Sequence, residues 1–285
     1  MFGILNIFKP AGMTSHDVVN YIRKITGVKQ IGHTGTLDPF AEGVLPVCVG
    51  KAARLIEFLP DDKEYSAVVQ FGKSTDTYDL EGEITSISDK KVTSNDVETA
   101  LKNFEGEIEQ LPPLYSAIKV KGRKLYDYAR KGEHAEIKPR KVIIEEIKLK
   151  NFDDELQTAE ILVKCSKGTY IRSIAYDLGQ ILETGGYLTK LLRTKAGKFR
   201  IENSLHLEYL KENFSEHLLI NPLEVLELPV KYVTDTELGK IKHGQALKNT
   251  GLEYNKTVIL ACGDNTVCAV GCADFDRIFI KKVFL

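Results

Sequence analysis

The sequence has no tryptophan, and its five cysteines include no Cys-x-x-Cys pair. An odd number of cysteines without paired spacing argues against a disulfide framework and against a zinc ribbon. Cys268 and Cys272 come closest to a metal-binding spacing, but TVCAVGCADF reads as a strand, and no histidine or second cysteine pair accompanies them. We therefore expect most of the cysteines to be small buried apolar residues, and we expect no bound metal.

Long apolar segments and nucleotide-binding signatures are also missing. The chain contains no run of 18 apolar residues and no charged N-terminal region followed by an apolar stretch, so we expect a soluble, cytoplasmic protein with no membrane association. Neither GxxxxGK[ST] nor GxGxxG occurs, and no cofactor is expected. With 285 residues, 43% of them hydrophobic, the chain is long enough for one large domain and a small one.

The chain has almost no net charge, but its charges are segregated along the sequence. Residues 119–150 carry eleven Lys or Arg against five acids, and residues 187–200 carry five basic residues and no acid. Residues 61–109 carry thirteen acids against five bases. Because phosphate binding depends on local potential, this pattern permits a polyanionic partner, although solvated charged faces explain the charges equally well.

Hydrophobic periodicity predicts an alternation of strands and helices. The apolar run at 3–8 predicts a strand, and 14–27 predicts a helix with Thr14 or Ser15 as N-cap and Gly27 at its end. Further strands are expected at 44–49, at about 141–151 and 156–165, and from 65 onward. Further helices are expected at 52–59 and 94–104, and along the apolar stripe of Ile171, Ile174, Ala175 and Leu178.

Two changes of composition divide the chain. The basic, tyrosine-containing region 119–141 is bounded by Gly122 and Pro139 and is predicted to form a protruding lobe. Pro229 follows a leucine-rich acidic stretch and precedes short strand-like segments that run to the last residue. We therefore predict a domain of residues 1–229 and a small β-rich domain of residues 230–285.

Asp38 lies in GHTGTLDPFAEGVLPVCVG (32–50), a glycine-rich stretch with little charge. As an N-cap with Pro39 at the first helical position it would begin a helix, but Gly43 and Pro46 leave room for hardly more than one turn. The residue before a proline is pushed toward extended geometry, so the carboxylate would be rigidly presented. Such an acid can be a nucleophile, a general base, a cap or a metal ligand, the last being the weakest because only Glu42 lies nearby.

Five segments together resemble the bacterial TruB-type tRNA pseudouridine synthases. They are GILNIFKPAGMTSHDVV, GHTGTLDPFAEGVLPVCVGKAAR, KEYSAVVQFGKSTDTYDLEG, CSKGTYIRSIAYDLG and LLRTKAGKF. Their order and spacing cover residues 1–200, and residues 230–285 are more weakly similar to the PUA-like RNA-binding domain of that family. The resemblance implies an α+β fold with a mixed, largely antiparallel central sheet flanked by helices.

The resemblance also implies a reaction, the isomerisation of uridine 55 in the tRNA T-loop to pseudouridine, without metal or cofactor. Asp38 would be the nucleophile, and Arg172 would keep it ionised, since a nearby cation offsets the cost of desolvating a carboxylate. The target base has to be flipped out of the RNA. By the same resemblance Tyr65 would stack on it, Tyr170 would lie at its edge and Leu191 would close the pocket.

RNA contacts follow from the same resemblance. His33 would insert where the uridine leaves the T-loop, the lobe at 119–141 would grip the T-arm, and three cations would contact phosphates, namely Lys190, Arg193 and Lys195. Lys9 and Pro10 would support the catalytic loop. The partner would be the T-arm of tRNA, with no obligatory protein partner and a monomer as the default state.

Two other functions remain open at this point. The chain could be a tRNA-binding or tRNA-folding protein with secondary or absent catalysis, which intact Asp38, Tyr65, Tyr170 and Arg172 argue against. A glycoside hydrolase would need a second acid as partner. No acid in STDTYDLEGE matches a motif of that kind, although Asp76 and Asp79 could be brought close by folding.

Overall fold

The computed structural model describes residues 1–116, 118–120, 122–129, 133 and 136–285. A large mixed sheet dominates it, with the strand order β1-β3-β12-β4-β11-β10-β7. Its members are β1 (Gly3–Lys9), β3 (Glu42–Val49), β12 (Gly186–Ala196), β4 (Lys63–Phe71), β11 (Thr158–Cys165), β10 (Arg140–Asp153) and β7 (Gly106–Gln110). Short β2 (Ile31–His33) pairs with β3, and β13 (Phe199–Arg200) pairs with β12.

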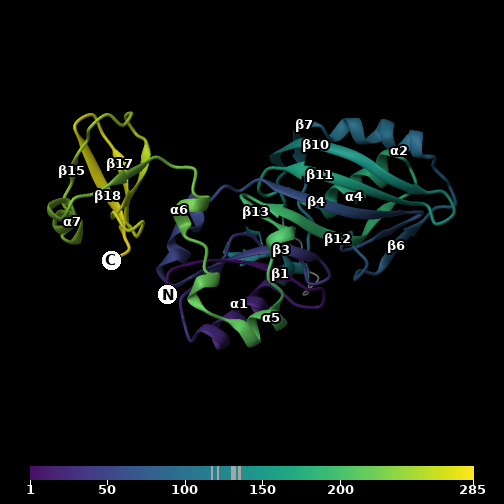
Figure 1. Cartoon of the computed structure of the whole chain (residues 1–285). Helices are drawn as coiled ribbons and strands as arrows, with labels where there is room; N and C mark the ends of the chain where they lie inside the picture. Colours follow the sequence, from purple (N-terminus) through teal and green to yellow (C-terminus); the bar gives the residue numbers. More distant parts are fainter. Residues whose placement is uncertain (117, 121, 130–132, 134–135) are drawn as a thin grey trace.

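Strand β12 joins the part of this sheet formed by β1 and β3 to the part formed by β4, β11, β10 and β7. It pairs in parallel with β3 through two residue pairs and antiparallel with β4 along most of its length. The other pairings along the main path are antiparallel. The predicted largely antiparallel sheet is therefore confirmed, and the last long strand of the domain lies in its middle (Figure 1).

Helices cover the sheet through two separate cores. Helix α1 (Ser15–Thr26) and α5 (Leu207–Asn213) pack with β1 and β3, below these strands in Figure 1. Helices α2 (Ser94–Leu101) and α4 (Ile171–Ile181) pack on the part of the sheet formed by β4, β10 and β11. As predicted, α1 has Thr14 as N-cap and ends at Gly27, whose φ of 69° is the left-handed conformation that glycine tolerates.

The segment predicted as a helix at 52–59 forms a 3₁₀ helix, η1 (Gly50–Phe58). Its buried side chains include Ala52 and Leu55, three residues apart. That spacing suits three residues per turn, because side chains at i and i+3 then lie on one line.

Shorter elements connect the main ones. They are β5 (Lys73–Thr75) with β6 (Ile84–Ile87), η2 (Lys102–Phe104), β8 (Lys119–Val120) with β9 (Arg123–Lys124), α3 (Leu125–Ala129), η3 (Ile201–Asn203), η4 (Glu216–Leu218) and α6 (Pro222–Val225). The hairpin β8–β9 and α3 begin the basic region 119–141, part of which lies outside the described residues. The lobe therefore stays a prediction.

A second sheet begins at Val230 and has the strand order β14-β16-β17-β18-β15. Its elements are β14 (Val230–Tyr232), α7 (Asp235–Lys242), β15 (Leu247–Lys248), β16 (Thr257–Ala261), β17 (Val267–Ala273) and β18 (Arg277–Val283). This C-terminal module docks on η1, where Phe284 and Ile259 share a core with Leu55. Arg54 donates to the carbonyl of Val283 at 2.7 Å across the same contact.

The expectation that the cysteines form no disulfide is wrong for one pair. Cys262 and Cys268 are joined across the β16–β17 turn, with their Cα atoms 6.5 Å apart. The amide of Cys262 donates to Thr266 at 2.9 Å, so the hairpin itself brings the two residues together. Cys48 and Cys165 are buried free thiols, as expected. None of the helices in the described part of the chain is long and apolar enough to cross a membrane.

Candidate active site

The loop between β2 and β3 presents Asp38 outside any helix, at the start of a turn in which the amide of Ala41 donates to the Asp38 carbonyl at 3.1 Å. The hydroxyl of Ser15, the first residue of α1, both accepts from the amide of Leu37 at 2.9 Å and donates to its carbonyl at 3.2 Å. The backbone at Asp38 is therefore restrained by the fixed Leu37 before it and by Pro39 after it. The helix-cap interpretation of Asp38 is excluded, because the chain passes directly into β3 at Glu42.

Asp38 meets Arg172 from α4 in a two-point ion pair. Nη2 of Arg172 donates to Oδ1 of Asp38 at 2.9 Å, and Nε lies 2.9 Å from Oδ2. The arginine side chain is only 5% exposed and the aspartate 30%, so the pair is partly shielded from water and its carboxylate remains open to a cavity. Charge-assisted contacts in such surroundings are stronger than at a surface.

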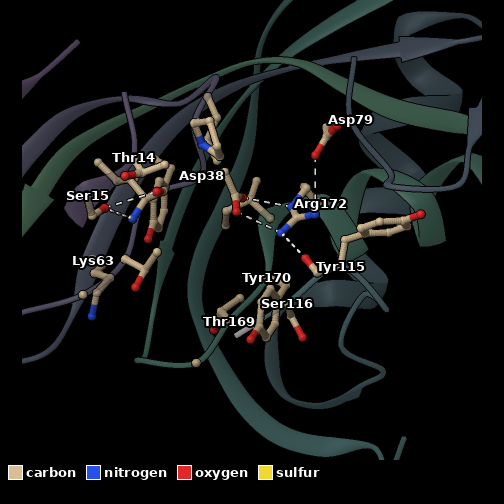
Figure 2. A pocket seen from close by; sticks show the side chains of 18 of the residues that line it. Thr14, Ser15, Asp38, Lys63, Asp79, Tyr115, Ser116, Thr169, Tyr170 and Arg172 are labelled. Atoms are coloured by element: carbon tan, nitrogen blue, oxygen red, sulfur yellow. Dashed lines mark hydrogen bonds and ion pairs between the residues drawn. The ribbon is translucent and has the colours of Figure 1, made fainter. Parts of the chain in front are cut away.

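Three further oxygens hold the guanidinium of Arg172. Nη1 donates to the carbonyl of Thr77 at 3.1 Å, and Nη2 donates to the carbonyl of Tyr115 at 3.0 Å. The carboxylate of Asp79 lies 3.4 Å from Nη1. Figure 2 shows both aspartates beside Arg172, with Asp38 to its left and Asp79 above it. The guanidinium is thus fixed in one orientation toward Asp38.

Asp79 is a buried partner of Arg172 that no sequence motif assigned to this site. Oδ1 of Asp79 accepts from the hydroxyl of Thr77 at 2.6 Å and from the amide of Glu81 at 3.0 Å. Burial raises the pKa of Asp79, while the Thr77 hydroxyl and Arg172 oppose that rise. These contacts occupy its carboxylate, which argues against the paired catalytic acids of a glycoside hydrolase.

A cavity of about 900 Å³ opens in front of the ion pair. Its lining includes Tyr65 from β4, Leu191 from β12 and Tyr170 immediately before α4. The side chain of Gln110 clamps the backbone of Tyr170, accepting from its amide at 2.7 Å and donating to its carbonyl at 3.0 Å. Tyr65, Tyr170 and Leu191 thus give one part of this otherwise largely polar cavity an aromatic and apolar lining, which suits a planar ligand.

His33 lines the same cavity at the end of β2. Its ring is half-buried, and its Nδ1 is buried without a hydrogen-bond partner among the described residues. Burial, with Arg193 nearby, lowers the pKa of His33, which favours the neutral ring. Taken together, the cavity gathers His33, Tyr65, Tyr170, Leu191, Asp38 and Arg172 around one space.

Known proteins are similar in sequence to this chain over nearly its whole length. Residues 23–171 match the N-terminal domain model of the TruB family pseudouridylate synthases. The tRNA pseudouridine synthase B of Caldanaerobacter subterraneus subsp. tengcongensis is 44% identical over 285 residues, covering 99% of each chain. That of Clostridium novyi is 40% identical over 291 residues, covering 100% of each. The chain belongs to the TruB family. It is a pseudouridine synthase, an enzyme of the isomerase class.

The fold of this TruB-family enzyme is also that of solved structures. The chain in the crystal structure of the archaeal box H/ACA sRNP Nop10-Cbf5 complex superimposes with a TM-score of 0.72 at 25% identity, covering 99% of this chain and 86% of that one. The match to a Cbf5-Nop10-Gar1 complex has a TM-score of 0.71 at 26% identity, covering 100% and 85%. The predicted pseudouridine synthase fold is thereby confirmed.

The TruB-family enzyme does not present all three predicted phosphate-binding cations in the same way. Lys190 is exposed, whereas Lys195 is half-buried and pairs with Asp62 at 2.7 Å. Arg193 has no exposed surface, and it donates to the carbonyls of Val44 at 2.7 Å and Gly35 at 3.1 Å. The prediction of a surface contact for Arg193 is therefore wrong, because this side chain is buried against the loop between β2 and β3.

Lys9 supports the other end of that loop. Its ammonium donates to the carbonyls of Pro10 at 2.8 Å and Pro39 at 3.2 Å, and the side chain is fully buried. Burial lowers the pKa of Lys9 to about 8, against the opposing effect of Glu42 and Asp38. Two buried cations, Arg193 and Lys9, thus hold the carbonyls on either side of Asp38.

Further cations at the mouth of the cavity were not singled out from the sequence. Lys63, two residues before Tyr65, donates to the carbonyl of Asp61 at 2.7 Å. Lys167, from the loop before α4, pairs with the carboxylate of the same aspartate at 2.6 Å. Both line the cavity. Among the described residues, no group of three or more His, Cys, Asp or Glu could hold a metal ion.

Proposed function

We propose that this enzyme isomerises uridine 55 in the T-loop of tRNA to pseudouridine, with Asp38 as the nucleophile. The observation that carries the proposal is the two-point ion pair of Asp38 and Arg172 at a cavity lined by Tyr65 and Tyr170. A carboxylate paired with a fixed guanidinium can attack, while aromatic rings can receive a base taken out of the RNA.

The reaction conserves all atoms of the nucleotide. Asp38 forms a covalent bond either to C1′ of the ribose or to the pyrimidine ring, and the N1–C1′ bond breaks. The uracil turns over in the cavity, C5 bonds to C1′, C5 loses its proton, N1 gains one, and the bond to Asp38 breaks. Dividing one hard bond exchange into two steps lowers each barrier, and no oxidant or reductant is consumed.

The cavity residues have separate proposed roles. Tyr65 stacks on the flipped uracil, Tyr170 lies at its edge near C5, and Leu191 closes the pocket. His33 enters the T-loop where the uridine leaves, and a neutral ring suits a position among stacked bases. These assignments are supported by the shared lining of one cavity.

The remaining proposals concern the RNA and the rest of the chain. Lys190 and Lys195 contact phosphates of the T-arm, to which the region 119–141 also binds. Residues 1–229 form the catalytic domain, and residues 230–285 form a PUA-like RNA-binding domain. We propose that the enzyme acts as a cytoplasmic monomer without an obligatory protein partner.

The decisive test uses a T-arm stem-loop that carries tritium at C5 of the target uridine. We expect tritium release by the wild type and none by Asp38→Asn, with RNA binding largely kept. Asp154→Asn, in the exposed β10–β11 turn, is the matched control and should release tritium at the wild-type rate. Normal turnover by Asp38→Asn would contradict the proposal. RNA binding by the wild type without release would instead favour a tRNA-binding protein.

A further inference from the structure

The turn that supplies two of the oxygens on Arg172 contains a residue in a rare backbone conformation. Tyr78, between Thr77 and Asp79, has a φ of 63°. This left-handed conformation is unfavourable for any residue with a β-carbon, so neighbouring contacts must hold it. It turns the chain so that the carbonyl before Tyr78 and the carboxylate after it reach the same nitrogen, Nη1 of Arg172.

The contacts that hold Tyr78 come from two elements. The amide of Leu188 in β12 donates to its carbonyl at 3.0 Å. Its ring stacks on the ring of Tyr176 in α4, with the centroids 4.0 Å apart and the planes at 19°. Stacked aromatic pairs stabilise beyond the area that they bury. The stack therefore opposes relaxation of the unfavourable backbone at Tyr78.

The stack places the turn around Tyr78 against the same helix that carries Arg172. Tyr176 follows Arg172 by four residues in α4, and residues at this spacing lie on the same face of a helix. The turn around Tyr78 consequently contacts α4 at two points one helical turn apart. One point is the guanidinium of Arg172, and the other is the ring of Tyr176.

We infer that the stack of Tyr78 on Tyr176 is a positioning device for the reaction. It fixes the turn on α4, and the turn holds the guanidinium of Arg172 in the plane that meets both oxygens of Asp38. Neither tyrosine belongs to the lining of the cavity, so the pair acts through Arg172 and not on the RNA. This inference rests on the proposed function, in which Asp38 and Arg172 carry the chemistry.

Single-turnover kinetics with saturating enzyme test the inference, because the rate constant is then independent of the fraction of folded enzyme. We expect Tyr176→Leu to slow tritium release from the T-arm stem-loop about 3- to 10-fold, the loss that corresponds to one aromatic pair. The dissociation constant for the RNA should stay within about twofold. Tyr176→Phe keeps the aromatic stack and should release tritium at the wild-type rate. Tyr209→Leu, on α5, is the matched control.

The backbone at Tyr78 provides a second pair of variants that does not depend on the folding of Tyr176→Leu. Tyr78→Ala and Tyr78→Gly both remove the ring, but only glycine adopts a φ of 63° without strain. We expect Tyr78→Gly to keep more of the rate than Tyr78→Ala. Equal rates for these two variants, or a wild-type rate for Tyr176→Leu, would overturn the inference.

A readout without turnover separates this inference from the proposed function. The Nε proton of Arg172 belongs to a side chain that is 5% exposed, so it should exchange slowly with solvent in the wild type and in Tyr176→Phe. Its exchange should accelerate in Tyr176→Leu. Absence of tritium release by the wild type would contradict the proposed function alone, whereas unchanged exchange in Tyr176→Leu would contradict the positioning role.

Discussion

The ammonium of Lys9 donates a hydrogen bond to the carbonyl of Pro39, one residue beyond Asp38, at 3.2 Å. Lys9 of β1 thus holds the β2–β3 loop one residue after Asp38, and Arg193 holds the same loop three residues before Asp38, at the carbonyl of Gly35, at 3.1 Å. A loop held at both of these carbonyls needs little reorganisation for Asp38 to act as the proposed nucleophile, and such preorganisation lowers reaction barriers.

Replacing Lys9 by Met should test this support. The change keeps the apolar length of the side chain but removes the ammonium donor from the carbonyls of Pro10 and Pro39, so that Pro39 keeps only the amide of Gly12. We expect kcat for tritium release to fall about 10-fold, with KM little changed. Lys24→Met, at an exposed position of α1, is the control. A wild-type kcat for Lys9→Met would show that the loop holds its geometry without this contact.

Arg172→Lys should reduce turnover far more than RNA binding. A lysine cannot reproduce the two contacts of the planar guanidinium with Asp38 or its bonds to Thr77 and Tyr115. We expect a loss of about 100-fold or more in the single-turnover rate, the order of one to two charge-assisted hydrogen bonds. Filter binding would measure RNA affinity, with exposed Arg277→Lys as control. Unchanged turnover would remove Arg172 from the mechanism.

Asp79→Asn should have a smaller effect on the rate. The amide keeps the size of the side chain and can still accept hydrogen bonds from Thr77 and Glu81, but it loses the charge that faces Arg172. We expect a loss of about 10-fold in the single-turnover rate, less than for Asp38→Asn. A loss as complete as that of Asp38→Asn would instead assign Asp79 a direct part in the chemistry.

Asp177 on α4 should make stability depend on pH. Burial raises the pKa of Asp177 to about 6, above its ordinary value near 4, so the folded state binds more protons between these values. Its stabilising contribution is therefore complete below about pH 4 and is lost as the pH rises through about 6. The variant Asp177→Asn has no titratable group at this position. Between pH 4 and pH 7.5 the free energy of unfolding of this variant should therefore rise by about 1 kcal/mol relative to that of the wild type, a value discounted for partial exposure. Urea unfolding at both pH values measures the gain, and a constant difference would contradict it.

Periodicity and caps located many of the elements in the sequence. Thr14 and Gly27 mark the ends of α1 because a side-chain acceptor and a left-handed glycine are local requirements. The strands β10 and β11 lie where alternation of apolar residues places them. The pairing of Cys262 with Cys268 could not be read from their spacing, because it depends on the turn that joins β16 to β17.

The candidate site was predictable where motif and charge agreed. Asp38 needed a distant cation, and Arg172 supplies it across 134 residues of chain. Arg193 was misplaced because a cluster of basic residues was read as a surface. The alternation of buried residues along β12 could have predicted the burial of Arg193, because Leu191 and Arg193 are two residues apart and point to the same buried side. The position of Asp79 beside Arg172 depends on how the turn at 77–79 folds, and no local sequence pattern predicts that turn.

The place of β12 in the sheet has a consequence for synthesis on the ribosome. This strand lies between β3 and β4, yet the chain produces it only after β11 and α4. Until residue 196 has emerged, the N-terminal strands and the middle strands each have an unfilled edge and no common partner. Contacts of such long sequence separation form late in folding. We expect a nascent chain halted before β12 to lack the closed cavity, because Leu191, which forms part of the cavity wall beside Asp38, has not yet been synthesised.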